Sequence, residues 1–240
     1  ELISILGNAQ NEKHLNAIFA KHNVDVVFHA AAYKHVPIVE NNVIEGIKNN
    51  VFTTKSICNA VLKNKVKNFV LISTDKAVRP TNVMGASKRV SELIVKYFAR
   101  RANDSSAKSI YSVVRFGNVL DSSGSVIPLF RKQISEGGPI TLTHENIERY
   151  FMTIVEAAQL VLYASSLADG GDIFLLEMGK PVKIKTLAEQ MILLSGKSIR
   201  DENNPNGEIK IQISGLRKGE KLYEELLVEK KSISTKHQLI

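Results

Sequence analysis

The sequence predicts an α/β fold built on a doubly wound parallel sheet, with a smaller lobe towards the C-terminus. Three observations predict it. Short apolar runs rich in β-branched residues, such as VDVVFHA, are typical of buried strands. Long helical patterns separate these runs, as βαβ units require. After about residue 120 the alternation loosens, and shorter strands and helices follow one another.

The individual elements follow from the apolar periodicity. Strands are expected at 2–6, 24–30, 68–73 and 109–116, and helices at 11–22, 39–64 and 82–102. Further along, helices are expected at 125–136, 153–167 and 184–195, and strands at 139–143, 172–177 and 209–214. We therefore expect a Rossmann-like domain at 1–120, with its first βα units missing, and a mixed α/β lobe at 121–240, interleaved with the first.

Composition limits the classes of function. The formal charge of +8 suits a phosphate-bearing ligand, an acidic membrane surface or a nucleic acid. The chain has no Trp and its basic residues are scattered, so we expect no nucleic-acid partner. The single cysteine, Cys58, excludes an intrachain disulfide and fits a reducing compartment, and without a Cys or carboxylate cluster we expect no metal. The chain contains no apolar run of membrane-spanning length and opens mid-pattern without Met, which we interpret as a fragment.

The segment LISTDKAVRPTNVMGASKR concentrates reactive side chains at one predicted strand tip. The strand ends in Thr74, Asp75 and Lys76, and the next helix carries Met84 and Lys88. Residues four apart lie on one helix face, so Met84 and Lys88 point the same way. A hydroxyl, a carboxylate and two ammonium groups can then converge, with an acid and a base side by side. Taken alone, the motif equally allows a strand-end turn with an exposed ion pair.

This segment resembles the extended short-chain dehydrogenases/reductases, with Met84 at the position of their Tyr. The departure is similar to the UDP-N-acetylglucosamine 4,6-dehydratases of capsule and protein-glycan biosynthesis. The resemblance continues in HAAAYKHVPIVENN, RFGNVLDSSGSVIPLF, ITLTHENIERYFMTIVEA, EMGKPVKI and GLRKGEKLYEELL, and so covers nearly the whole chain. The family's Gly-rich pyrophosphate loop is absent, Lys218 replaces a Pro, and Asn8 replaces the Asp that faces adenine.

The resemblance implies a three-part reaction with bound NAD. Hydride leaves sugar C4, water is eliminated across C5 and C6, and the hydride returns to C6, giving a UDP-4-keto-6-deoxy-N-acetylhexosamine. It implies Lys76 as the C5 base, Asp75 as the C6 acid, Thr74 as partner of the 4-hydroxyl and Lys88 as partner of the nicotinamide ribose. Met84 offers no base, so the 4-hydroxyl proton must leave through Asp75, Lys88 or ordered water.

The resemblance also implies two sets of binding residues. The expected NAD contacts are Asn8, Ala9, Ala30, Ala31, Ala32, Tyr33, Asn50, Ser73 and Lys88. The expected contacts to the UDP-sugar are Lys34, Thr74, Asn118, Ser125, Val126, Pro128, Thr141, Arg149, Arg217 and Glu220. From the residues alone, the alanines also suit tight packing, which is compatible with cofactor contact. Asn50 equally suits an exposed helix face, and composition favours a solvated surface for the arginines.

Two other functions stay open on the sequence. The same fold hosts epimerases and reductases, which would lack the pair Asp75 and Lys76. A nucleotide-sugar-binding module that has lost catalysis would fit Met84 in place of Tyr. We expect a homo-oligomer with a cytoplasmic catalytic domain, and the resemblance leaves open that a missing N-terminal region anchors the full-length protein to the inner face of the cell membrane.

Overall fold

The computed structural model describes residues 1–105, 108–227 and 232–240. The chain divides into two compact units. The first comprises residues 1–116, 159–177 and 226–240, and the second comprises residues 117–158 and 178–225. The first unit carries the predicted strand tips, so its architecture decides how the reactive side chains meet.

A parallel sheet of four strands forms the centre of the first unit, in the order β1-β2-β3-β8. The strands are β1 (Val26–His29), β2 (Asn68–Thr74), β3 (Ile110–Phe116) and β8 (Ile173–Leu175). All neighbouring pairs are parallel, which confirms the predicted α/β Rossmann-like class. Because parallel strands end at the same edge, the carboxyl ends of β1, β2 and β3 lie together there.

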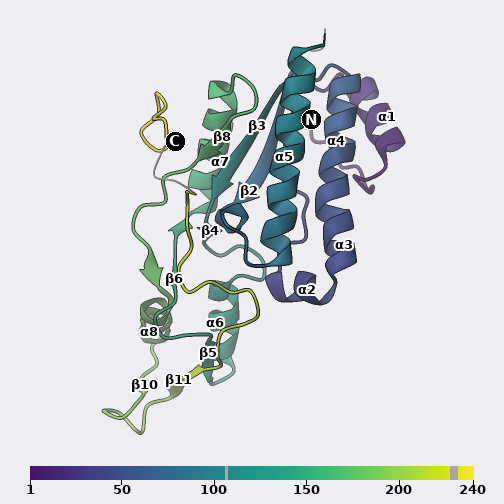
Figure 1. The fold of residues 1–240 in the computed structure, drawn as a ribbon. Helices are drawn as coiled ribbons and strands as arrows, with labels where there is room; N and C mark the ends of the chain where they lie inside the picture. The colour runs from purple at the N-terminus through teal and green to yellow at the C-terminus, as the bar shows by residue number, and fades with distance from the viewer. Residues whose placement is uncertain (106–107, 228–231) are drawn as a thin grey trace. The chain divides into compact units, whose positions relative to one another are not determined.

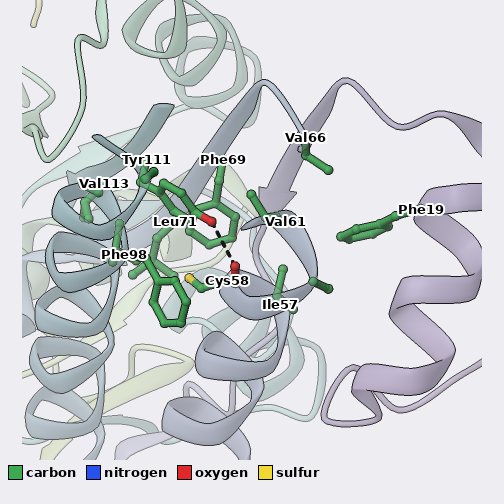
Figure 2. Close-up of a cluster of buried hydrophobic side chains, with 14 residues drawn as sticks. Phe19, Ile57, Cys58, Val61, Val66, Phe69, Leu71, Phe98, Tyr111 and Val113 are labelled. Atoms are coloured by element: carbon green, nitrogen blue, oxygen red, sulfur yellow. Dashed lines mark hydrogen bonds between the residues drawn. The ribbon is translucent and has the colours of Figure 1, made fainter. Parts of the chain in front are cut away.

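Helices cover this sheet, and two of them pack side by side (Figure 1). They are α4 (Thr53–Lys63) and α5 (Val83–Asn103), and α1 (Glu12–His22) packs against α4. Helix α7 (Ile154–Leu167) precedes β8. The core between α4, α5 and the strands contains Phe69, Phe98 and Tyr111, and the Tyr111 hydroxyl donates to the Cys58 carbonyl oxygen at 2.9 Å (Figure 2).

Local chemistry fixes where α5 begins. The side chain of Asn82 accepts a hydrogen bond from the Gly85 amide and so forms the N-cap of the helix. A Cβ atom at Gly85 would collide with the carbonyl oxygen of Lys76. Only glycine therefore allows the first turn of α5 to pack this closely on the short 3₁₀ helix Asp75–Ala77 that follows β2.

The predicted helix at 39–64 is wrong as a single element. The structure has α2 (Val36–Asn41), α3 (Val43–Ile47), a π-helical turn (Lys48–Phe52) and then α4. Asn42 breaks the first helix, because its side chain donates to the Ile38 carbonyl oxygen and its backbone leaves the helical region. The π turn keeps the helical periodicity nearly intact, so the apolar pattern does not reveal it.

The predicted strand at 2–6 is also wrong. These residues form no strand, and Leu2 and Leu6 are fully exposed. The apolar pattern is suitable, but an extended segment becomes a strand only beside a partner with which it exchanges backbone hydrogen bonds, and no described strand pairs with it. The predictions at 11–22, 24–30, 68–73, 82–102 and 109–116 are confirmed, with boundaries displaced by at most two residues.

The second unit is a smaller α/β assembly with its own core. Its helices are α6 (Val126–Ser135) and α8 (Ile184–Leu194), and its strands are β4 (Asn118–Val119), β5 (Ile140–Leu142), β6 (Glu148–Arg149), β7 (Phe151–Met152), β9 (Val182–Lys183), β10 (Ile199–Arg200) and β11 (Ile209–Ile213). Strands β10, β11 and β5 form a parallel sheet. Phe130, Ile140 and Ile192 are fully buried in the core of this unit. The predicted helices and longer strands are confirmed, whereas the two-residue strands are too short to show a period.

No helix in the described ranges is long and apolar enough to cross a membrane. Within the same residues, no three His, Cys, Asp or Glu side chains gather in a way that would hold a metal ion.

Candidate functional site

The tip of β2 folds three reactive side chains onto one another. Thr74 ends the strand and caps the 3₁₀ helix, since its hydroxyl accepts from the Lys76 amide at 3.3 Å. That hydroxyl donates to Asp75 Oδ1 at 2.8 Å, and Lys76 Nζ donates to the same oxygen at 3.0 Å. The ion pair is not an exposed one, because the Asp75 side chain is 0% exposed and that of Lys76 only 20%.

Asp75 keeps one carboxylate oxygen without a partner. Oδ1 receives hydrogen bonds from Thr74, from the Lys76 amide and from Lys76 Nζ, whereas Oδ2 is buried and meets no donor within the described residues. Leaving a buried carboxylate oxygen without a donor costs about 1–3 kcal/mol or more. Such an atom is suited to a hydroxyl group brought by a ligand.

Lys88 lies on α5, close to the same strand. Its ammonium group is buried, 6% exposed, and donates to the Ile72 carbonyl oxygen on β2 at 2.6 Å. Burial lowers the pKa of Lys88 to about 8, and the negative charge of Glu92 opposes that lowering. Met84, one turn earlier, is 4% exposed. The structure therefore brings a carboxylate, two amines and a hydroxyl to one sheet edge, with a thioether in place of a phenol.

The π-helical turn presents Asn50 to the loop after β1. Its side-chain amide accepts from the Tyr33 amide at 2.7 Å and donates to the Tyr33 carbonyl oxygen at 3.0 Å. It also donates to the Ser87 hydroxyl on α5 at 2.9 Å. Asn50 is fully buried, so the alternative of an exposed helix face is excluded. π turns often accompany functional sites, because they redirect a side chain without ending the helix.

His29 closes the end of β1 and is neutral. Its Nε2 lies 3.0 Å from the Thr54 hydroxyl, which itself donates to the Asn50 carbonyl oxygen at 2.8 Å. Since that hydroxyl has only one proton, Nε2 must be the donor and Nδ1 carries the lone pair. Burial first, and then the charge of Lys88, lower the pKa of His29 to about 3.

The loop after β1 leaves small side chains at the strand tip. Ala30 and Ala31 are exposed and Ala32 is half-buried, so tight core packing does not explain them. Tyr33 and Lys34 are exposed beside them. The other expected NAD contacts lie earlier in the chain: the Asn8 side chain accepts from the Gln10 amide, and Ala9 packs against the hydrophobic core.

In the second unit, the guanidinium of Arg149 is hydrogen-bonded to backbone carbonyl oxygens of the same unit. Its guanidinium donates to the carbonyl oxygens of Glu148, Lys221 and Leu222 and lies 3.6 Å from the Glu220 carboxylate. Glu220 also accepts from the Thr143 hydroxyl and the Arg217 amide. These bonds tie the segment around residue 220 to β6. The structure thus brings Arg149 and Glu220 together, while the guanidinium of Arg217 stays exposed without a recorded partner in the described chain.

The other expected sugar-nucleotide contacts of this unit lie on different elements. Asn118 belongs to β4, and the Thr141 hydroxyl on β5 accepts from the Gln133 side chain. Ser125 is the N-cap of α6, although its buried hydroxyl finds no partner in the part of the unit that the structure describes. Val126 and Pro128 lie in the first turn of α6 and are half-buried.

Sequence reasoning missed one central residue, Glu92. It is fully buried on α5, accepts from the Ser73 hydroxyl at 2.7 Å and pairs with Arg115 through two hydrogen bonds. The available signal was its position four residues after Lys88, on the same helix face, together with an arginine at the end of the neighbouring strand.

Known proteins resemble the chain over almost all of its length. The capsular polysaccharide biosynthesis protein CapD of Staphylococcus aureus is 49% identical over 227 residues, which cover 95% of this chain and 36% of CapD. A UDP-glucose 4-epimerase of Rickettsia rickettsii is 39% identical over 222 residues, covering 92% of this chain and 61% of the epimerase. The X-ray structure of Pen from Bacillus thuringiensis superimposes with a TM-score of 0.83 at 36% identity, covering 93% of this chain and 66% of Pen.

The chain therefore spans about a third of the length of CapD and under two thirds of the epimerase. The sequence profile of one family, described as polysaccharide biosynthesis protein, matches residues 1–240 without interruption. Together with a parallel sheet whose strand tips gather acid, base and amine groups, this match shows that the chain belongs to the polysaccharide biosynthesis protein family.

Proposed function

We propose that this chain is catalytic and carries out the NAD-dependent 4,6-dehydration of a UDP-N-acetylhexosamine, with UDP-N-acetylglucosamine as the expected substrate. One observation carries the proposal. Asp75 and Lys76 form an acid–base pair at a strand tip, and the buried Asp75 Oδ2 has no donor among the described residues. Elimination of water from a sugar needs an acid at one carbon and a base at its neighbour.

The residues of the first unit fit NAD as the cofactor. The Lys88 ammonium uses one donor on Ile72, which leaves donors for the hydroxyl groups of a ribose. Asn50 fixes both backbone polar groups of Tyr33, and the exposed alanines before it let a flat ring approach the backbone. When bound, NAD would accept a hydride from sugar C4 and return it to C6. We assign the expected NAD contacts, including Ser73, to this unit.

The pair Asp75 and Lys76 can complete its own proton cycle. Their Oδ1–Nζ distance of 3.0 Å lets one proton pass from the ammonium to the carboxylate, leaving a neutral amine and a carboxylic acid. The amine of Lys76 then removes the C5 proton, which a ketone at C4 has made acidic. Asp75 gives its proton to the C6 hydroxyl, which leaves as water. These two transfers leave Lys76 as the ammonium and Asp75 as the carboxylate, as at the start. When the hydride returns to C6, Lys76 gives a proton to C5, and the proton released earlier by the 4-hydroxyl restores the charge of Lys76.

Met84 leaves the 4-hydroxyl without a phenol to take its proton. The Thr74 hydroxyl is already linked to Asp75 Oδ1 at 2.8 Å, so a 4-hydroxyl bound to Thr74 would lie one hydrogen bond from that carboxylate. Asp75, Lys88 and ordered water remain the three routes for this proton. Met84 itself supplies volume and keeps water away from the site.

We propose that the second unit binds the UDP part of the substrate. The exposed Arg217 has its guanidinium donors available for a diphosphate, which suits that planar fork. Arg149 has most of its donors on carbonyl oxygens, so we assign it the task of holding the Arg217 and Glu220 segment in place. The remaining expected contacts, Asn118, Ser125, Val126, Pro128 and Thr141, stay proposals for the same ligand.

The similarity to a UDP-glucose 4-epimerase favours a second candidate, epimerisation at C4. An epimerase, however, would give Asp75 and Lys76 no task at C5 and C6. A binding module without catalysis is the third possibility.

The full-length protein should be incubated with NAD⁺ and UDP-N-acetylglucosamine in deuterated water, and the products analysed by NMR and mass spectrometry. Dehydration predicts loss of one water and deuterium at C5, epimerisation predicts an isomer of unchanged mass, and a module predicts unchanged substrate.

We also propose a homo-oligomer in which the outer faces of α4 and α5 meet those of a second copy. Val90, Leu93 and Tyr97 are exposed there and line a hollow of about 330 Å³. Such a contiguous apolar surface on helices usually marks an interface. From the resemblance, we propose a cytoplasmic location for the catalytic domain, with the full-length protein at the inner face of the membrane.

A further inference from the structure

Glu92 is a fully buried carboxylate whose two oxygens accept four hydrogen bonds. Its Oε1 accepts from the Ser73 hydroxyl and from Arg115 Nε, both at 2.7 Å. Its Oε2 accepts from Arg115 at 2.6 Å and from Arg89 at 2.9 Å. Both oxygens are therefore satisfied, in contrast to those of Asp75.

These bonds join one helix to two strands. Ser73 on β2 and Arg115 on β3 face each other in the parallel register, and Glu92 on α5 binds both. One turn earlier on the same helix, Lys88 donates to the carbonyl oxygen of Ile72, the residue before Ser73. Helix α5 is thus attached to two consecutive residues of β2, immediately before Thr74 and Asp75.

We propose that Glu92 is a positioning residue for the dehydration proposed above. Through Ser73 and Arg115 it fixes the height and rotation of α5 against β2, so that Lys88 stays aligned with the Thr74–Lys76 tip. Its negative charge also keeps the buried Lys88 in the ammonium form, which has three donors to offer. The inference rests on the proposed function only for the identity of the reaction. The effect of Glu92 on the position and charge of Lys88 does not depend on which reaction is catalysed.

The charge balance around Lys88 supports this role. Burial lowers the pKa of Lys88 to about 8, and Glu92 is the charge that works against the lowering. His29 is neutral, with a pKa of about 3, and so adds no repulsion. The other charged groups that bond near the first turns of α5 include Arg89 on α5 itself, Arg115 on β3, Asp75 and Lys76 after β2, and Glu40 on α2.

A merely structural ion pair would behave differently. Removing one partner of a buried pair destabilises a protein by about 3–5 kcal/mol, whatever the pair does for a neighbouring site. The loss of stability alone therefore does not identify a positioning role. The titration of Lys88 reports the charge that Glu92 supplies to it, and turnover reports whether Lys88 stays aligned.

The test measures the titration midpoint of Lys88 in the NAD-free chain, by NMR of its Cε atom, with the signal assigned through Lys88→Arg. In Glu92→Gln the midpoint should fall by about one pH unit or more, because the opposing charge is gone. If that variant does not fold, Glu92→Gln with Arg115→Met leaves no buried charge unpaired. Losing the arginine raises the midpoint and losing the carboxylate lowers it, so the double variant is compared with Arg115→Met alone, below which its midpoint should fall. Arg89→Ala is the matched control, because it removes only the partly exposed partner of Glu92. A midpoint in folded Glu92→Gln equal to that of wild type, or in the double variant equal to that of Arg115→Met, overturns the inference.

A second measurement links the inference to turnover. In the full-length enzyme, the alkaline limb of the kcat profile should move to lower pH in Glu92→Gln by the same amount as the Lys88 midpoint, with KM for the sugar nucleotide nearly unchanged. An alkaline limb that does not follow the midpoint overturns the positioning role. If the wild type converts no sugar nucleotide while the midpoint still falls, the proposed reaction is wrong and the hold of Glu92 on Lys88 stands.

Discussion

The side chain of Asn50 binds both backbone polar groups of Tyr33, as a neighbouring strand would. It accepts from the amide at 2.7 Å and donates to the carbonyl oxygen at 3.0 Å. The loop after β1 therefore owes its course to a residue of the π turn, seventeen positions later in the chain. A third bond, to the Ser87 hydroxyl, anchors that amide on α5. The loop, the π turn and the helix that carries Lys88 thus form one connected arrangement.

Replacing Asn50 should loosen this loop and weaken NAD binding. Asn50→Ala leaves the amide and carbonyl of Tyr33 without their partner, and we expect a loss of about 2–4 kcal/mol in the free energy of unfolding. In the full-length protein, calorimetry should show NAD binding weakened roughly tenfold, equivalent to about 1.4 kcal/mol. Asn49→Ala, next to it on the same turn, removes only a donor to Asn50 and is the control. Equal NAD affinity in both variants would contradict the role of Asn50.

Asp75 and Lys76 should both be required for the elimination. Asp75→Asn removes the acid and leaves the shape of the turn, while Lys76→Ala removes the base. Each change should lower turnover of UDP-N-acetylglucosamine by roughly two or more orders of magnitude, the usual contribution of a general acid or base. The measurement is the rate of 4-keto product formation by the full-length enzyme. Near-normal dehydration by both variants would sink the assignment.

Substitutions of Met84 should matter far less than those of Lys88. Met84→Leu keeps an apolar side chain of similar volume in a buried position, so most activity should remain. Met84→Tyr places a larger ring and a hydroxyl without an assured partner there, and should bring no large gain. Lys88→Ala should be nearly inactive. A Met84→Tyr variant many-fold faster than wild type would identify a damaged Tyr-type site and favour the module without catalysis.

His29 should make the protein less stable as the solution becomes acidic. Its pKa is about 3 in the folded chain and near 6.5 when unfolded, so between these values the unfolded state binds the extra proton. The free energy of unfolding should therefore fall with decreasing pH below about 6.5, by at most about 1.4 kcal/mol per pH unit. Urea titrations at about pH 7 and pH 5 should show a smaller difference in His29→Gln. His22→Gln, on the last turn of α1, should retain the wild-type difference.

A charge on the outer face of α5 should separate the copies of a homo-oligomer. Leu93 is 50% exposed beside Tyr97, and Leu93→Glu would place a carboxylate in the proposed interface. Light scattering coupled to size-exclusion chromatography should then report a monomer. Leu194→Glu changes an exposed leucine at the end of α8 and should leave the mass as in wild type. A wild-type protein that is itself monomeric would refute the proposal.

The sequence predicted well those elements whose apolar pattern is repeated over several turns or residues. Helix α5 and the strands before and after it were predicted within one residue of their bounds. The segment at 2–6 shows the limit, because a strand depends on a partner that its own residues do not encode. The break at Asn42 and the π turn depend on side-chain bonds that periodicity does not register.

The candidate site was predictable where its reactive residues are adjacent in the sequence. Asp75 and Lys76 are adjacent in the sequence, and their contact in the structure is the simplest consequence. Glu92 lies on α5 and Arg115 on β3, and only the packing of this helix against the sheet brings the two side chains together. The neutrality of His29 could not be predicted, because it follows from burial and from the nearby charge of Lys88, and the sequence shows neither.

Because of the π turn at Lys48–Phe52, the orientation of Asn50 depends on the number of residues in this helical segment. A π turn holds one residue more than an α turn, so a deletion within it would restore ordinary helical geometry without disrupting the helix. Each residue of an α-helix advances by about 100°, and that rotation would swing the amide of Asn50 away from Tyr33. Many substitutions along this face would leave the hydrogen-bonded loop in place, whereas the deletion of one codon within the π turn would break the bonds between Asn50 and Tyr33.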